Sequence, residues 1–252
     1  MDGPVLRARG LAKEFRGFRA VDGVDLDVAE GSVHALVGPN GAGKTTLFNL
    51  LTGFLAPSAG SIMFGSRDLA GLSPERVARL GVARSFQITS LFPQMSPREH
   101  LELALAGATR LTWRFWRSER LLDRFRDRAL ELLEHVGLGA HAGTPAGVLA
   151  YGHKRALELA LALALDPKVL LLDEPTAGMG VEDVDRTVEL VKKIRAGRTV
   201  VMVEHNMNVV STLADRVTVL QSGRVLAEGP YAEIRHDPRV VSAYLGDAHA
   251  GH

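Results

Sequence analysis

A glycine-rich segment between an apolar run and a helical pattern constrains the fold more than any other feature of this sequence. Residues 38–45 read GPNGAGKT, which fits the spacing G-x-x-x-x-G-K-[ST]. The preceding run, residues 33–37, is apolar enough for a buried strand, and residues 44–51 have helical spacing that ends before Gly53. Strand, loop and helix in this order are the context in which the spacing forms a phosphate-binding loop.

The residues of this loop have the chemistry that phosphate requires. Its glycines let successive backbone N–H groups close around a phosphate, and the amino end of the following helix favours negative charge. Lys44 can reach the β and γ phosphates of a nucleotide, and the hydroxyl of Thr45 can bind Mg²⁺. We assign nine residues to nucleotide binding: Gly38, Pro39, Asn40, Gly41, Ala42, Gly43, Lys44, Thr45 and Thr46.

A second apolar run ends in two carboxylates. Residues 169–172 read VLLL, and Asp173 and Glu174 follow them. In α/β sheets, ligands bind at the edge where the strands end, so Asp173 is expected to hold Mg²⁺ through water and Glu174 to polarise the attacking water. Alone, the pattern is also typical of a strand that ends in solvent. The phosphate-binding loop upstream favours the catalytic interpretation.

The remaining pattern predicts an α/β fold, a P-loop NTPase with a mixed sheet, an antiparallel β subdomain and a helical subdomain. The first 65 residues alternate like antiparallel strands, and residues 96–164 have helical spacing. Residues 169–203 return to the strand and helix rhythm of βαβ units, and residues 221–223 read QSG between two strand-like runs, which predicts a hairpin. We expect one ATPase domain over residues 1–246, with the helical subdomain inserted at about 90–160, and a tail at 247–252.

Composition excludes several classes of protein. Thirty basic and 29 acidic residues leave a net charge of +1, which gives no overall cationic field for nucleic acid or an anionic membrane. The absence of cysteine excludes disulfides, thiolate metal sites and a cysteine nucleophile. The amino terminus lacks the apolar stretch of a signal peptide, and the most apolar later segment, from Leu157, carries Glu158, so we expect no membrane span.

Together with the motifs above, three further positions make the chain resemble the nucleotide-binding subunits of ABC transporters over nearly its whole length. Gln87, after Phe86, resembles the glutamine of the Q-loop, and His205 in VMVEH resembles the switch histidine. Phe15 matches the aromatic residue that stacks on adenine. The resemblance implies that Gln87 contacts Mg²⁺ and the attacking water and senses the membrane subunit, and that His205 contacts the γ-phosphate and helps to orient the water.

Residues 149–153 resemble the signature motif of that family, which closes over the γ-phosphate bound in the opposite subunit. The residues are Leu149, Ala150, Tyr151, Gly152 and His153. The more usual signature is Leu-Ser-Gly-Gly-Gln, so Ala150 removes one hydroxyl donor. Leu-Ala-Tyr-Gly is similar to the variant in ATPase subunits of branched-chain amino-acid importers, as are residues 174–179, 237–240 and 243–246. These similarities favour that subfamily.

The resemblance also implies cofactors, partners and a location. It implies ATP and Mg²⁺, with Thr45, Gln87 and Asp173 as the metal contacts and with Glu174, His205 and Gln87 as the catalytic set. The implied partners are two transmembrane permease subunits, a second ATPase subunit that is either this chain or a similar one, and, indirectly, a solute-binding protein. No nucleic acid is implied. The expected location is the cytoplasmic face of a bacterial or archaeal plasma membrane, where the chain would be peripheral.

Several alternatives remain open at this point. The cargo could be urea or short amides, or the system could export lipopolysaccharide; an exported solute-binding protein would indicate import. A non-transport ABC ATPase, for DNA repair or ribosome rescue, is a further alternative. Residues 112–120, TWRFWRSER, mix aromatic and arginine residues, which suits packing on the helical subdomain, contact with a partner or a membrane surface, or single-stranded nucleic acid.

Overall fold

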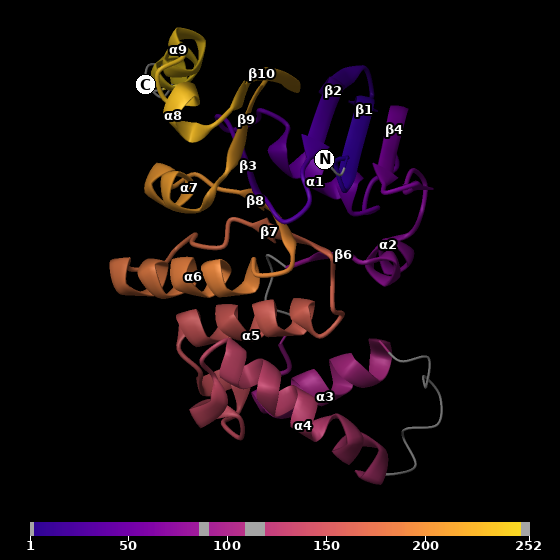
Figure 1. Ribbon diagram of the computed structural model, residues 1–252, viewed down its shortest axis with the longest axis vertical. Helices are drawn as coiled ribbons and strands as arrows, with labels where there is room; N and C mark the ends of the chain where they lie inside the picture. The colour runs from indigo at the N-terminus through magenta and orange to yellow at the C-terminus, as the bar shows by residue number, and fades with distance from the viewer. Residues whose placement is uncertain (1–2, 86–90, 109–118, 248–252) are drawn as a thin grey trace.

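The computed structural model describes residues 3–85, 91–108 and 119–247, which form two sheets with helices around them (Figure 1). The strands are β1 (Leu6–Phe15), β2 (Phe18–Val28), β3 (Val33–Val37), β4 (Ala59–Phe64), β5 (Arg67–Asp68), β6 (Val82–Arg84), β7 (Val169–Asp173), β8 (Thr199–Val203), β9 (Arg216–Gln221) and β10 (Arg224–Gly229). The α-helices are α1 (Lys44–Leu51), α2 (Pro74–Leu80), α3 (Pro97–Ala108), α4 (Glu119–His135), α5 (Tyr151–Leu163), α6 (Val181–Ile194), α7 (Met207–Leu213), α8 (Tyr231–Ile234) and α9 (Pro238–Asp247). Two short 3₁₀ helices, η2 (Gly139–His141) and η3 (Ala146–Val148), lie between α4 and α5.

The larger sheet is mixed and the smaller one antiparallel. In the larger sheet the strand order is β10-β9-β3-β8-β7-β6, where all neighbours are parallel except the β9–β10 pair. The smaller sheet has the order β2-β1-β4-β5. The predicted hairpin is present: Ser222 and Gly223, which separate β9 from β10, have φ angles of 47° and 78°, as the tight turns of hairpins require. The predicted fold class is therefore confirmed.

Two apolar clusters cover the two faces of the mixed sheet. Along β3, Val33, Ala35 and Val37 belong to a cluster with the helices from α3 to α9, whereas Leu36 belongs to a cluster with α1 and the antiparallel sheet. Successive side chains of a strand point to opposite faces, so a strand covered on both faces is apolar throughout. This burial explains the continuous apolar runs of β3, β7 and β8. Because these three strands are parallel, the loops that follow them lie at one edge of the sheet.

The helices α3, α4 and α5 follow one another between β6 and β7 and lie together beyond α6 (Figure 1). Residues 112–118 and the side chains of 119 and 120 lie outside the described part of the chain, so the interpretation of residues 112–120 stays open. The boundaries of the ATPase domain and of the helical subdomain also remain predictions. In the described ranges, no helix combines the length and the apolar character that a transmembrane span needs.

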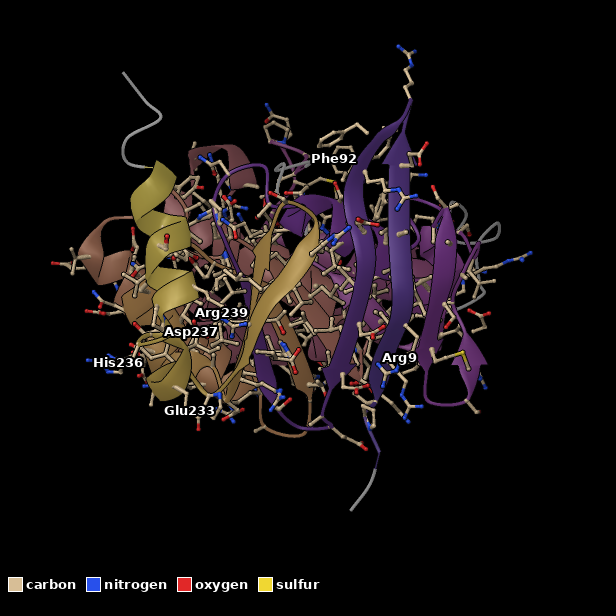
Figure 2. All side chains as sticks on the ribbon, turned by 90° about the horizontal axis from the view of Figure 1, so that it is seen from above. Arg9, Phe92, Glu233, His236, Asp237 and Arg239 are labelled. Carbon is tan, nitrogen blue, oxygen red and sulfur yellow. The ribbon has the colours of Figure 1, made fainter. Side chains whose placement is uncertain are left out.

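The C-terminal helix α9 begins with a local charge pair. Asp237 precedes Pro238, accepts a hydrogen bond from the backbone N–H of Arg239 at 2.8 Å, and pairs with its guanidinium at 2.7 Å (Figure 2). The hydrogen bonds from Arg239 lower the pKa of Asp237 to about 2. The two side chains therefore fix the entry to α9, in the segment whose sequence favours the amino-acid importer subfamily.

His34 is a titratable group in the middle of β3, and it is fully buried. Its Nε2 lies 2.7 Å from Thr218 Oγ1, and Thr218 donates in turn to Glu228 Oε2 at 2.9 Å. Within the described residues, His34 Nδ1 has no hydrogen-bond partner. Burial lowers the pKa of His34 to about 4; the Glu228 carboxylate opposes this shift and the Arg216 guanidinium adds to it. His34 is therefore neutral in the folded protein at neutral pH.

We expect the free energy of unfolding to fall as the pH decreases from about 6.5 to about 4. In this window the unfolded chain, with an ordinary histidine pKa of 6.5, binds a proton that the folded chain resists. The part due to His34 is about 2 kcal/mol between pH 7 and pH 5. Urea titrations of the natural chain and of His34→Gln, which keeps a donor for Thr218 and cannot titrate, measure this difference. An identical pH dependence in both proteins would contradict the assignment.

Candidate nucleotide-binding and catalytic site

The glycine-rich loop lies between β3 and α1 and is held closely by two other strands. Gly38 has a φ of 148°, and a Cβ there would lie 2.2 Å from the carbonyl oxygen of Leu220. Gly43 has a φ of 100°, and a Cβ there would lie 2.4 Å from the carbonyl oxygen of Ala20. Neither position tolerates a side chain. The close approach of β2 and β9 therefore explains why the loop has glycine at these two positions.

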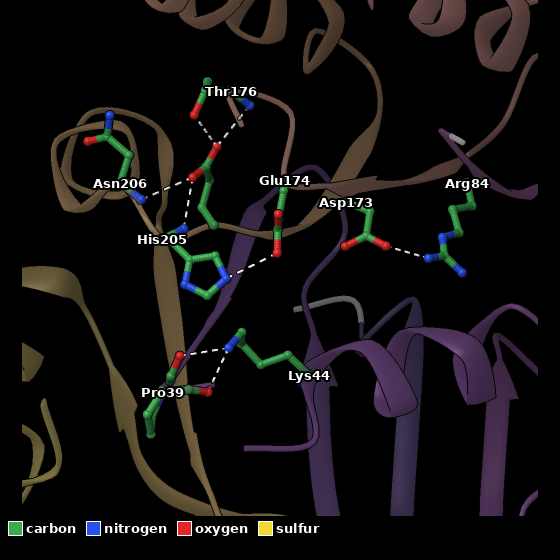
Figure 3. A network of polar contacts seen from close by, with 10 residues as sticks. Pro39, Lys44, Arg84, Asp173, Glu174, Thr176, His205 and Asn206 are labelled. Carbon is green, nitrogen blue, oxygen red and sulfur yellow. Dashed lines mark hydrogen bonds and ion pairs between the residues drawn. The ribbon is translucent and has the colours of Figure 1, made fainter. Parts of the chain in front are cut away.

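The start of α1 presents backbone N–H groups and an ammonium to the loop. Gly43 is the N-cap, and among the described residues no side chain caps this helix end. Lys44 is 6% exposed, and its Nζ donates to the carbonyl oxygens of Gly38, at 2.7 Å, and Pro39, at 2.8 Å (Figure 3). Thr45 is exposed in the first turn. A concave loop with uncapped N–H groups and a cation is a binding site for phosphate.

The first carboxylate of the pair, Asp173, ends β7 and is buried. Its side chain is 1% exposed; Oδ2 pairs with the guanidinium of Arg84, whereas Oδ1 has no hydrogen-bond partner among the described residues. Arg84, at the end of the neighbouring strand β6, also donates to Asn49 Oδ1 of α1 at 2.6 Å. A buried oxygen without a donor is costly unless a ligand satisfies it. Asp173 thus has one oxygen suited to a cation or to metal-bound water.

The second carboxylate, Glu174, meets the predicted histidine. Glu174 Oε1 lies 3.1 Å from Nε2 of His205, and the side chains are 28% and 44% exposed (Figure 3). The Glu174 backbone has a φ of 46°, an uncommon conformation outside glycine, and its N–H donates to the carbonyl oxygen of Val203 at 3.0 Å. Two residues that are 31 positions apart in the sequence therefore come together at the edge of the mixed sheet.

The segment that resembles a signature motif forms the start of α5. Ala150 is the N-cap, without a side-chain hydrogen bond. The hydroxyl of Tyr151 donates to the carbonyl oxygen of Ala177 at 3.1 Å and accepts from Nε of Arg155 at 3.1 Å. Gly152 packs closely, since a Cβ there would lie 2.9 Å from Asp183 Oδ1. Tyr151 therefore links the start of α5 to the loop that follows Glu174.

Three more of the predicted residues lie in the described part of the chain, and a fourth lies outside it. Phe15, at the end of β1, is 41% exposed, and Lys13 Nζ lies 5.3 Å from its ring centroid. Leu149 is buried, and the ring of His153 contacts that of His141 at 4.4 Å between centroids. Gln87 lies outside the described residues.

Sequence reasoning missed two residues that form an ion pair or a hydrogen bond with predicted site residues. They are Arg84, the partner of Asp173, and Glu204, which is 3% exposed and precedes His205. The signal for Glu204 was available, because the run VVMV before it ends in an acid in the same way as the run VLLL before Asp173. Arg84 had no comparable signal, since a basic residue at a strand end is ordinary.

Comparisons with known proteins agree with these features. The family model for ABC transporters matches residues 21–177, and the model for branched-chain amino acid ATP-binding cassette transporters matches residues 224–250. The chain is similar to the high-affinity branched-chain amino acid transport ATP-binding protein BraF of Pseudomonas aeruginosa, with 41% identity over 98% of this chain and 100% of BraF.

Solved structures of similar proteins share the fold. The chain resembles an ATP-binding cassette of an ABC transporter in its ADP conformation, with a TM-score of 0.84, 29% identity, and coverage of 96% of this chain and 98% of that one. It also resembles a dimeric ATP-binding cassette in a post-hydrolysis state with ADP and Pi, with a TM-score of 0.75, 26% identity, and coverage of 90% and 98%.

Proposed function

This chain belongs to the ABC transporter family of ATP-binding proteins, and from that membership we propose that it hydrolyses ATP to drive an importer for branched-chain or related hydrophobic amino acids. One observation carries the choice of cargo. The similarity to BraF extends over 98% of the chain, and residues 224–250, outside the general family match, fit the model specific to branched-chain amino acid transporters. The cargo itself would be handled by other subunits.

In the proposed mechanism, ATP binds with its phosphates in the loop between β3 and α1. The uncapped N–H groups of α1 face the β and γ phosphates, and Lys44 exchanges its bonds to Gly38 and Pro39 for phosphate oxygens. The exposed ring of Phe15 offers a stacking surface for adenine. The other residues assigned to the loop, among them Asn40, Gly41, Ala42 and Thr46, contribute backbone contacts.

The site also has the donors that Mg²⁺ prefers, which are a hydroxyl and carboxylate oxygen. Thr45 and Asp173 would hold the ion together with the phosphates, and the unpartnered Oδ1 of Asp173 supports this assignment. Gln87 is the third proposed contact. In the described ranges, no group of three or more acidic or histidine side chains could by itself hold a metal ion. When bound, Mg²⁺ would neutralise charge on the phosphates.

For hydrolysis, Glu174 and His205 would act on the water that attacks the γ-phosphate. Glu174 would accept a hydrogen bond from this water and polarise it, while His205, at 3.1 Å from Glu174, would orient the water and contact the γ-phosphate. Asp173, whose side chain is 1% exposed, would not act on this water. It pairs with Arg84 until a cation is present.

The proposed working unit is a head-to-tail dimer attached to membrane subunits. Residues 149–153 would close over ATP bound in a second ATPase subunit, which is either this chain or a similar one. Two permease subunits would form the pathway, and a solute-binding protein would deliver the cargo to them. The chain would lie on the cytoplasmic face of the plasma membrane. Closure on ATP and opening after hydrolysis would drive transport through differential affinity for ATP.

Uptake of radiolabelled leucine and isoleucine by the native host tests the proposed cargo. We expect replacement of the chain by Glu174→Gln to abolish high-affinity uptake of both amino acids and to leave uptake of an unrelated sugar unchanged. Amino-acid uptake at the normal rate, with loss of urea uptake or of lipopolysaccharide at the cell surface, would overturn the proposal in favour of another cargo. Mass spectrometry of proteins that co-purify with the chain from gently extracted membranes identifies the permease subunits.

A further inference from the structure

The loops that carry Glu174 and His205 are neighbours because their strands are neighbours. Strands β7 and β8 are parallel, with Asp173 opposite Val203. The residues after each strand therefore emerge side by side, and the N–H of Glu174 continues the pairing to the carbonyl oxygen of Val203 at 3.0 Å. Backbone pairing ends there, so another contact must set the positions of the residues that follow.

Glu204 supplies that contact, with one carboxylate oxygen for each loop. Its Oε1 accepts from the backbone N–H of Thr176, at 3.1 Å, and from the hydroxyl of Thr176. Its Oε2 accepts from the backbone N–H groups of His205, at 2.8 Å, and Asn206, at 3.0 Å (Figure 3). Four donors converge on a side chain that is 3% exposed, which matches a carboxylate, since it can only accept.

The loop that Glu204 holds has little freedom of its own. Only Glu204, His205 and Asn206 separate the end of β8 from the start of α7, and Asn206 caps that helix through Oδ1, which accepts from Asn208 N at 3.0 Å. With both ends fixed, the backbone of His205 can shift relative to the Glu174 loop only if the hydrogen bonds of Glu204 break. The backbone positions from which the Glu174 and His205 side chains approach to 3.1 Å therefore depend on a third residue, Glu204.

We propose that Glu204 is a positioning residue, which ties the His205 loop to the Glu174 loop through Thr176 and so sets the geometry of the two groups that act on the attacking water. The assignment rests on the proposed ATP hydrolysis and deepens it. In this role Glu204 acts through His205 and not by contact with the nucleotide. A buried carboxylate whose hydrogen bonds are all satisfied rigidifies the groups around it, and removal of one acceptor leaves a buried donor without a partner.

The variant Glu204→Gln tests this assignment with minimal change in shape. A glutamine side chain can accept through only one of its two ends, so a backbone N–H of one loop loses its partner. We expect kcat for ATP hydrolysis by the full-length chain to fall about tenfold or more, because misplacement of a catalytic group by about 1 Å costs on the order of 10²-fold. The KM for ATP and the Kd for a non-hydrolysable ATP analogue should stay within about twofold of the natural values.

A double-mutant cycle with His205→Ala separates positioning from a general structural effect. If Glu204 acts through His205, then Glu204→Gln should cost little in a chain that already carries His205→Ala. Glu189→Gln removes a carboxylate from the exposed face of α6, where it pairs with Lys192, and is the matched control with an unchanged rate. Should Glu204→Gln fail to fold, Thr176→Val removes a single hydrogen bond to Glu204 and enters the same cycle.

The outcomes distinguish this assignment from the proposed function. Absence of ATP hydrolysis by the unmodified chain would overturn both. Normal hydrolysis that Glu204→Gln leaves unchanged would overturn the positioning role alone. Fully additive effects of Glu204→Gln and His205→Ala, or a rise in the KM for ATP with kcat unchanged, would likewise show that Glu204 does not act through His205.

Discussion

Substitution of Glu174 by glutamine should reduce the rate of ATP hydrolysis about 10²-fold or more and leave ATP binding intact. Glutamine has the shape of glutamate, but it cannot take a proton from the attacking water. The Glu174 side chain lies at the sheet edge beside His205 and contacts none of the loop residues from Gly38 to Thr46 through a described hydrogen bond. The loop should therefore still bind ATP when hydrolysis is blocked.

The same variant should trap the ATP-bound dimer. If closure requires ATP and opening requires hydrolysis, a chain that binds and does not hydrolyse stays closed. Light scattering after size-exclusion chromatography in ATP and Mg²⁺ should show a dimer for Glu174→Gln and mainly monomer for the natural chain. Glu182→Gln is the matched control, since this carboxylate at the start of α6 is 92% exposed; its rate should be normal. Normal hydrolysis by Glu174→Gln would contradict the assigned role.

Much of the fold could be predicted because the pattern that specifies it is local. The apolar runs of β3, β7 and β8 are buried on both faces, and the structure places their ends where the sequence indicated. The glycines of the loop also report a local constraint, since Gly38 and Gly43 have positive φ angles. Strand order, by contrast, depends on which apolar faces fit together, and the sequence pattern alone does not specify it.

The site was less predictable because its supporting contacts connect distant segments. Arg84 reaches Asp173 across 89 positions, and Glu204 reaches Thr176 across 28. Each contact depends on strand order, which the sequence left open. Tyr151 is a similar case. The sequence shows a tyrosine in the motif, but it does not indicate that the hydroxyl of Tyr151 donates a hydrogen bond to the carbonyl oxygen of Ala177. The sequence thus indicates residues that resemble a motif, whereas the contacts of Arg84 and Glu204 required the structure.

The contact of Tyr151 connects parts that would serve different ATP molecules. In the proposed dimer, the segment from Leu149 to His153 faces the nucleotide of the second subunit, whereas the loop after Glu174 belongs to the nucleotide of its own chain. A hydrogen bond of 3.1 Å from Tyr151 to Ala177 joins the two within one chain. A shift of either loop on binding or hydrolysis would therefore stretch or break this hydrogen bond.

Substitution of Lys44 by alanine should weaken ATP binding by about 10²-fold, because a hydrogen bond to a charged group contributes about 1.5–3 kcal/mol. The ammonium is buried over the loop and donates to two carbonyl oxygens that phosphate oxygens would replace. Calorimetric titration with a non-hydrolysable ATP analogue measures the change. Lys192→Ala, which removes an exposed ammonium from α6, is the matched control and should bind normally.

Thermal unfolding separates lost binding from lost folding in the Lys44 variant. A ligand that binds only the folded state stabilises it in proportion to the logarithm of its concentration over Kd, so a 10²-fold rise in Kd removes up to about 2.7 kcal/mol of this stabilisation. We expect the variant to melt near the temperature of the natural chain when nucleotide is absent, and to gain much less from added nucleotide. An equal gain in both proteins would mean that Lys44 braces the loop carbonyls without binding phosphate, and the assignment of the loop would then depend on its backbone N–H groups alone.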